Sequence, residues 1–150
     1  MRFEQTRDAL LHVERFHRLA EQLYGELLEQ ADPRVVMLLD YLRRHEAKQA
    51  DNLRGVIGDL PPRVLNGWFK YSHDQDILLP LDAARLQPPK NFDEAFDLAF
   101  RLDEKLLEFY QEMIEQSPSG EAREIFINLL GQEMKEKQKL MRGALGLLDL

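Results

Sequence analysis

Residues 43–53 read RRHEAKQADNL, and this stretch decides how the chain folds. It lies late in a long helical pattern whose apolar stripe includes Leu42 and Leu53. The same stripe passes through Glu46 and Gln49, which are three residues apart and so share one face of a helix. Polar groups that point inward from an apolar face cost free energy unless they find partners. The stretch therefore predicts a polar site inside a helical core.

The composition narrows the class of protein before any motif is considered. The 150 residues are 44% hydrophobic and 31% charged, with a net charge of −7. This length predicts a single domain over residues 1–150, and the acidic balance argues against nucleic acid or an anionic membrane as partner. The lack of cysteine excludes disulfides and iron–sulfur sites. With no membrane-length apolar run and no signal-like N-terminus, we expect a cytoplasmic protein.

Four long helices are predicted from the three-to-four-residue spacing of apolar side chains. Asp32 is a good N-cap, and the proline after it is favoured in a first helical turn. Asn91 and Glu94 form a variant of the capping box. The predicted helices span residues 5–30, 33–57, 92–116 and 121–145.

Residues 59–91 interrupt this helical pattern with prolines and an Asn-Gly pair, which favour turns. Within them a short helix over residues 63–71 is predicted, with Trp68 and Phe69 as buried anchors. Together with Tyr71, they are interpreted as core or interface anchors and not as metal ligands. A connection of this length can return along a bundle, whereas the short connection at Asp32 forces its two helices to be antiparallel. The predicted fold class is all-α: an antiparallel four-helix bundle of two helix hairpins joined by a long crossover.

The two predicted hairpins repeat one another. A shift of 86 residues places Tyr24 on Tyr110, and a shift of 87 residues after the turn places Glu46 on Glu133. In this register, inward polar positions of one half fall on inward polar positions of the other. The six candidates for a metal site are His17, Glu46, Gln49, Asp103, Glu133 and Glu136.

These six residues have the layout of a di-metal carboxylate site. The first and third helices supply one each, and the second and fourth supply a pair spaced by three residues. Four carboxylates would balance the charge of two divalent cations in a core where bare charges are costly. The pattern favours a metal centre inside the bundle.

The arrangement resembles the ferritin-like superfamily and, within it, the rubrerythrin-type bundles. The two hairpins, the long crossover and the spacing of seven from Asp103 to Tyr110 carry the resemblance. In that family the first and third helices carry Glu, and the second and fourth carry Glu-x-x-His. Here His17 and Asp103 replace the single Glu residues, and the paired motifs end in Gln49 and Glu136 instead of His. The resemblance is therefore to a bundle with a degenerate di-metal site.

This resemblance implies iron or manganese between the helices and reaction with peroxide or dioxygen, as in a non-haem di-metal oxidoreductase. Rubrerythrins carry a cysteine-rich iron domain that supplies electrons, and this chain has no cysteine. A separate electron donor is therefore implied. A site for one metal, a site of altered metal preference and a lost site all remain open.

The alternative is a non-catalytic helical bundle that has lost its metal site and acts through homodimerisation or other protein–protein contacts. A protonated His17 could pair with Glu46 or Glu133 in a closed polar network. Phe100, Phe109 and Phe126 could then serve a dimer interface as readily as a core.

Two other histidines and one polar stretch are not interpreted as metal ligands. His12 and His45 fall off the inward stripes and are expected to face solvent. Residues 73–76, which read HDQD, are expected to form a solvated loop in the crossover.

Overall fold

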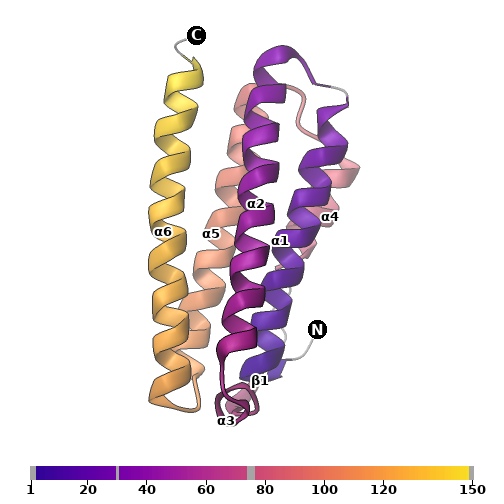
Figure 1. The fold of residues 1–150 in the computed structure, drawn as a ribbon. Helices are drawn as coiled ribbons and strands as arrows, with labels where there is room; N and C mark the ends of the chain where they lie inside the picture. Colours follow the sequence, from indigo (N-terminus) through magenta and orange to yellow (C-terminus); the bar gives the residue numbers. More distant parts are fainter. Residues whose placement is uncertain (1–2, 30, 74–76, 149–150) are drawn as a thin grey trace.

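The computed structural model describes residues 3–29, 31–73 and 77–148 of the chain. Helices dominate it, with one pair of short strands (Figure 1). In chain order the elements are β1 (Phe3–Gln5), α1 (Thr6–Leu28), α2 (Pro33–Asp59), α3 (Pro62–Leu65), β2 (Trp68–His73), α4 (Leu79–Leu86), α5 (Phe92–Gln116) and α6 (Gly120–Leu148).

The four long helices form the predicted bundle of two hairpins. α1 and α2 share the most extensive interface, followed by α5 and α6. The crossover returns along the bundle beside α1, so α5 begins at the end where α1 turns into α2 (Figure 1). α2 and α5 therefore run in the same direction, while each hairpin is antiparallel. The all-α, two-hairpin fold expected from the sequence is confirmed.

Local capping explains where two of these helices begin. The Asp32 carboxylate accepts hydrogen bonds from the backbone N–H groups of Arg34 and Val35 at 3.0 and 3.1 Å. The Asn91 side chain accepts one from the Glu94 N–H at 2.9 Å. Each cap satisfies donors that a helix N-terminus leaves unpaired. The caps predicted at both positions are therefore present.

The crossover differs from its prediction. Instead of one helix over residues 63–71, it contains α3, the strand β2 and the helix α4. β2 pairs antiparallel with β1, and the Thr6 N–H donates to the Gly67 carbonyl at 2.9 Å. This pairing extends the backbone and alternates its side chains. Phe69 is buried, but Trp68 is 62% exposed, so its expected role as a buried anchor is wrong.

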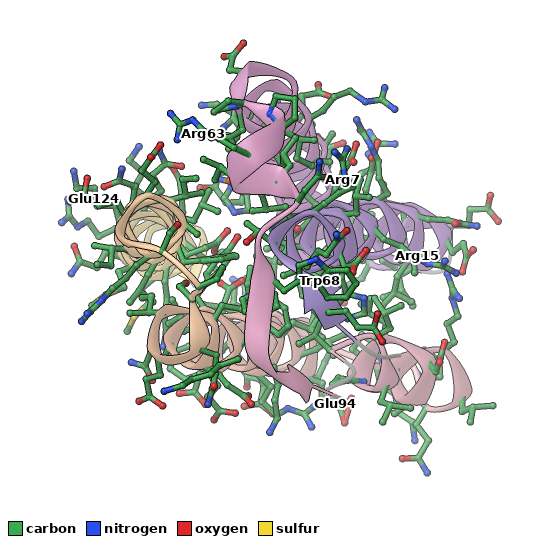
Figure 2. All side chains as sticks on the ribbon, turned by 90° about the horizontal axis from the view of Figure 1, so that it is seen from below. Arg7, Arg15, Arg63, Trp68, Glu94 and Glu124 are labelled. Atoms are coloured by element: carbon green, nitrogen blue, oxygen red, sulfur yellow. The ribbon has the colours of Figure 1, made fainter. Side chains whose placement is uncertain are left out.

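Other predictions for the crossover fall partly or wholly outside the described residues. The backbone of Tyr71 and His73 belongs to β2, but their side chains lie outside the described residues. The rest of the expected polar loop, residues 74–76, lies outside them as well. Seen end-on, β2 runs across one end of the bundle (Figure 2).

The core fills the space between the long helices. Phe109 and Phe126 are fully buried in it, so the suggestion that they serve an interface is wrong. Phe100 is half-buried, with the Lys137 ammonium 4.1 Å from its ring centroid. His12, expected to face solvent, is fully buried, and its ring lies 5.9 Å from that of Phe109.

Among the helices of the described ranges, none is long and apolar enough to cross a membrane.

Candidate metal centre

Helical periodicity brings five of the six predicted site residues into the core between the four long helices. α1 contributes one, α2 two, α5 one and α6 one. Each of these residues lies at helical spacing from neighbouring leucines, so it shares their buried face of the helix. The five buried residues are His17, Glu46, Gln49, Asp103 and Glu133, each at most 6% exposed.

A contact between α1 and α2 organises this cluster. His17 Nδ1 and Glu46 Oε2 are 2.5 Å apart and share a short hydrogen bond. The other ring nitrogen, Nε2, faces Glu133 Oε1 of α6 at 3.7 Å. Neither of these two facing atoms has a hydrogen-bond partner in the described structure. Two buried polar atoms thus face one another without a hydrogen bond between them.

Burial sets the protonation of the cluster. It raises the pKa of Glu46 to about 8, and nearby Glu21 adds to the shift. It also raises the pKa of Glu133 to about 8. It lowers the pKa of His17 to about 4, against the raising effect of Glu133. Near neutral pH the metal-free cluster therefore holds protonated carboxyls around a neutral imidazole, because no solvent stabilises the charged forms.

Asp103 interacts electrostatically with the other carboxyls of the cluster. Burial raises the pKa of its carboxyl well above the usual range, and Glu46 raises it further. Lys137 acts in the opposite direction, although its ammonium lies 3.7 Å from Glu104. No described lysine or arginine forms an ion pair with Glu46, Glu133 or Asp103.

Two tyrosines related by the internal repeat flank the carboxyls. Tyr24 and Tyr110 are each 1% exposed. Burial raises the pKa of both phenols well above 10. Glu46 and Asp103 add to the shift for Tyr24, and Glu133 and Glu46 for Tyr110. Both phenols therefore stay neutral beside the carboxyls and border them with aromatic rings.

Glu136 does not lie where the sequence suggested. Its side chain is 20% exposed at the edge of the bundle, where it faces His45 at 3.5 Å and Lys139 at 3.5 Å. His45, expected to face solvent, is only 12% exposed. One signal could have indicated this position: His45 lies four residues before Gln49 and so shares its side of α2.

Two unsatisfied donors of the cluster have a spacing that one metal ion could bridge. Metal ligands at about 2.1 Å in a tetrahedral arrangement stand roughly 3.4 Å apart, close to the 3.7 Å between His17 Nε2 and Glu133 Oε1. The partner of Nδ1 fits as well, because a metal-bound imidazole usually donates its other N–H to a carboxylate, and Glu46 is in that position. As placed, however, no three described His, Asp or Glu side chains converge on a single point.

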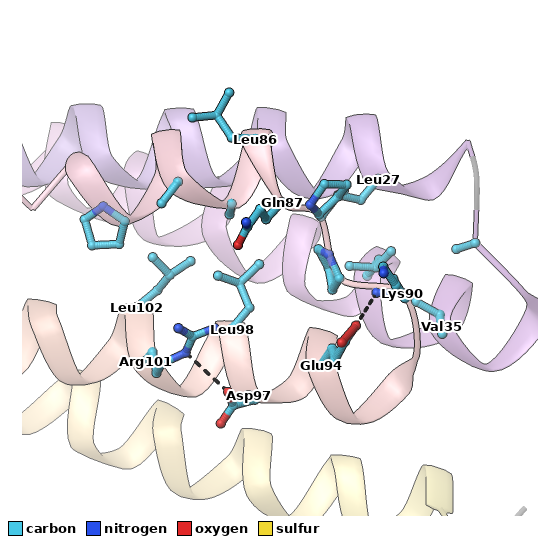
Figure 3. A pocket seen from close by; sticks show the side chains of 17 residues that line it. Leu27, Val35, Leu86, Gln87, Lys90, Glu94, Asp97, Leu98, Arg101 and Leu102 are labelled. Atoms are coloured by element: carbon cyan, nitrogen blue, oxygen red, sulfur yellow. Dashed lines mark hydrogen bonds and ion pairs between the residues drawn. The ribbon is translucent and has the colours of Figure 1, made fainter.

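A separate cavity of about 980 Å³ lies between α4, α5 and the turn of the first hairpin (Figure 3). Leu98 and Leu102 project into it from α5, and Gln87 points into it from the opposite wall. On α5, beside the cavity, Arg101 is paired with Asp97 at 3.3 Å. None of the six predicted metal ligands lines this cavity, so it is distinct from the polar cluster.

Comparison with solved structures identifies the class of fold. A protein of Thermotoga maritima, provisionally described as a ferritin-like diiron-carboxylate protein, superposes with a TM-score of 0.65. The match covers 92% of this chain and 93% of the other, at 17% sequence identity. No family model and no curated protein sequence matches the chain. The chain has a ferritin-like fold, and the finer resemblance to rubrerythrin-type bundles stays a prediction.

Proposed function

We propose that this bundle binds one divalent transition metal, of the iron or manganese type, in its core. The observation that supports this most is the facing pair of His17 Nε2 and Glu133 Oε1, both buried and without hydrogen-bond partners. A protein core rarely leaves such atoms unsatisfied, because each costs about 1–3 kcal/mol. A cation between them would satisfy both.

In this proposal His17 and Glu133 are direct ligands, and Asp103 supplies a further carboxylate. Glu46 is a positioning residue: it accepts the Nδ1–H of His17 and leaves the Nε2 lone pair for the metal. Glu133 and Asp103 then give two negative charges for one divalent cation. Gln49 and Glu136 are not needed as ligands, so the stoichiometry is one metal rather than two.

The bound metal would supply electron exchange with peroxide or dioxygen, as the family resemblance implies. The structural neighbour is itself described as a diiron-carboxylate protein. The protein's own residues would exclude water, hold the imidazole and provide protons. Glu133, whose raised pKa keeps it protonated near neutral pH, must release its proton when the metal binds, since only the carboxylate form is a ligand. Electrons would come from a separate donor.

Metal content tests the proposal directly. Protein freed of metal by a chelator is titrated with Fe(II) under anaerobic conditions, and separately with Mn(II), by calorimetry. We expect about one equivalent per chain in the parent, and loss of binding in Glu133→Gln and His17→Gln. Glu124, which is exposed on the same helix as Glu133 (Figure 2), provides the control: Glu124→Gln should bind like the parent. A parent that binds no more metal than Glu133→Gln would refute the proposal.

The alternative function, a metal-free bundle that associates with a second copy, has an observation of its own. Ile127, Met134 and Met141 are 43–51% exposed, and their spacing of seven residues places them on one face of α6. If the titrations show no metal, analytical ultracentrifugation of the parent and of Met134→Lys tests this function. A dimer that the substitution disrupts would support it.

A further inference from the structure

A second imidazole–carboxylate pair lies beside the core cluster, between α2 and α6. His45 Nδ1 and Glu136 Oε2 are 3.5 Å apart, and the two side chains are 12% and 20% exposed. His45 directly precedes Glu46 in α2, and Glu136 follows Glu133 by three residues in α6. The pair therefore lies between the solvent and the buried cluster.

The pair interacts with the cluster through charge. Glu136 raises the pKa of Glu133. Burial lowers the pKa of His45 against the raising effect of Glu136, and His17 lowers it further. Each outer group thus acts on one of the two inner atoms that face one another. A cation held at the outer pair would already lie within the field of the inner site.

The routes along the helices are closed by apolar side chains. Leu42, Leu106 and Leu129 lie one turn from Glu46, Asp103 and Glu133, and all three leucines are buried. A hydrated cation passing those leucines would lose water without gaining a ligand, which is costly in an apolar wall. The side between α2 and α6 instead offers an imidazole nitrogen and a carboxylate before the core is reached.

Two side chains, Tyr41 and Lys139, contact the outer pair from the solvent side without closing it off. The ring of Tyr41 stacks on His45 with 6.4 Å between centroids and 4° between planes. On the α6 side, the Lys139 ammonium lies 3.5 Å from Glu136 Oε1 and is 64% exposed. A surface ion pair of this kind contributes little stability and opens readily. An arriving cation can replace the ammonium on Glu136 without disturbing the core.

We propose that His45 and Glu136 form an outer station that captures a divalent transition metal and passes it to His17 and Glu133. This inference rests on the proposed metal-binding function and adds the route to that site. A mixed nitrogen and oxygen pair suits the same borderline cations as the inner ligands. Passage would be a ligand exchange: His45 and Glu136 would replace bound water, which returns to the solvent, and His17 and Glu133 would then replace the outer pair as Glu133 releases its proton.

Metal-uptake kinetics test the station with Co(II) as the probe, because its visible absorption reports nitrogen and oxygen ligands. Stopped-flow mixing gives the association rate, and transfer to an excess of chelator gives the dissociation rate. In His45→Gln and in Glu136→Gln we expect both rates to fall about tenfold or more. The equilibrium affinity and the stoichiometry should stay within about threefold of the parent, because a route affects both directions equally.

Two comparisons separate the station from other roles. Lys139→Met removes the competing ammonium and should speed association, while Glu124→Gln should change nothing. If Glu136→Gln instead lowers affinity through faster dissociation alone, Glu136 is a direct ligand and the station is wrong. If both variants load at the parent rate with one equivalent bound, the proposed function stands and this route is refuted. A parent that binds no Co(II), Fe(II) or Mn(II) refutes both.

Discussion

Replacing Glu133 with methionine should stabilise the metal-free protein. Glu133 is 3% exposed, and its Oε1 has no hydrogen-bond partner in the described structure. At pH 8, near its raised pKa of about 8, roughly half of these carboxyls are ionised in an apolar core. Methionine is unbranched, of similar length and adaptable in packing, so it can fill the space without a polar group.

The size of this effect follows from the atoms involved. Removing one unsatisfied buried polar atom recovers about 1–3 kcal/mol, and the methionine also buries apolar area. For a chain of this size, each kcal/mol changes Tm by roughly 2–4 °C. We therefore expect Tm to rise by roughly 2–12 °C in the Glu133→Met variant at pH 8.

The measurement is urea and thermal unfolding in the presence of EDTA, followed by circular dichroism. Glu124→Met makes the same chemical change at an exposed position of the same helix, and should stay within about 0.5 kcal/mol of the parent. The opposite sign would refute the reasoning. Breaking a buried ion pair costs about 3–5 kcal/mol, so a strongly destabilised Glu133→Met would mean that Glu133 is ionised and paired with a charged His17.

Three further predictions address protonation and the fold. Because their folded pKa values are raised, Glu46 and Glu133 contribute stability below about pH 4.5 that is lost as pH rises through about 8. His17, whose pKa is lowered, adds stability as pH rises from about 4 to 6.5 and has no further effect above that. From pH 6.5 to 8, the free energy of unfolding measured in EDTA should therefore fall by up to about 2.7 kcal/mol per pH unit. A flat profile would contradict protonated carboxyls. Metal binding at pH 7 should release one to two protons, seen as a dependence of the calorimetric enthalpy on buffer ionisation, and equal enthalpies in all buffers would count against it. Phe126→Ala should cost about 3–5 kcal/mol and Asp32→Ala about 1 kcal/mol in urea unfolding; a loss below 1 kcal/mol for Phe126→Ala would show that this ring is not a core anchor.

The long helices and most of the polar cluster were predictable because their signals are local. A period of 3.6 residues is visible in any window of the chain, and a cap such as Asp32 marks a helix start. The same period places Glu46 on the stripe of Leu42 and Leu53, and both the glutamate and the leucines are buried. The repeat then found Glu133 as the counterpart of Glu46.

What the sequence did not predict depends on distant contacts. β1 and β2 pair residues 3–5 with residues 68–73, and no local signal reports a partner more than 60 residues away. The burial of His12 has a similar cause. α1 packs against α2 on one side and meets α4 elsewhere, and Phe109 of α5 lies against the His12 ring. A helix with several neighbours buries a wider face than a single stripe suggests.

The internal repeat fails at one position for the same reason. Gln49 and Glu136 are equivalent in sequence, but Gln49 is buried and the Glu136 side chain is 20% exposed. α2 shares the most extensive interface of the bundle with α1, whereas α6 packs mainly on α5 and meets α2 less extensively. Equivalent positions therefore differ in depth, and this difference turns an expected inner ligand into an edge residue.

The buried carboxyls of the core give a second reason to expect a cation there. The chain has 20 lysines and arginines, yet none that the structure describes forms an ion pair with Glu46, Asp103 or Glu133. Leucine at these positions would give a more stable bundle, since buried carboxyls gain nothing from packing. A sequence that keeps them accepts lower stability in the metal-free state, as functional sites often do. If Glu133→Met is both more stable and unable to bind metal, that trade-off is demonstrated in one variant. If it is more stable and binds metal as the parent does, Glu133 is neither a ligand nor a source of stability, and the site must be sought elsewhere in the bundle.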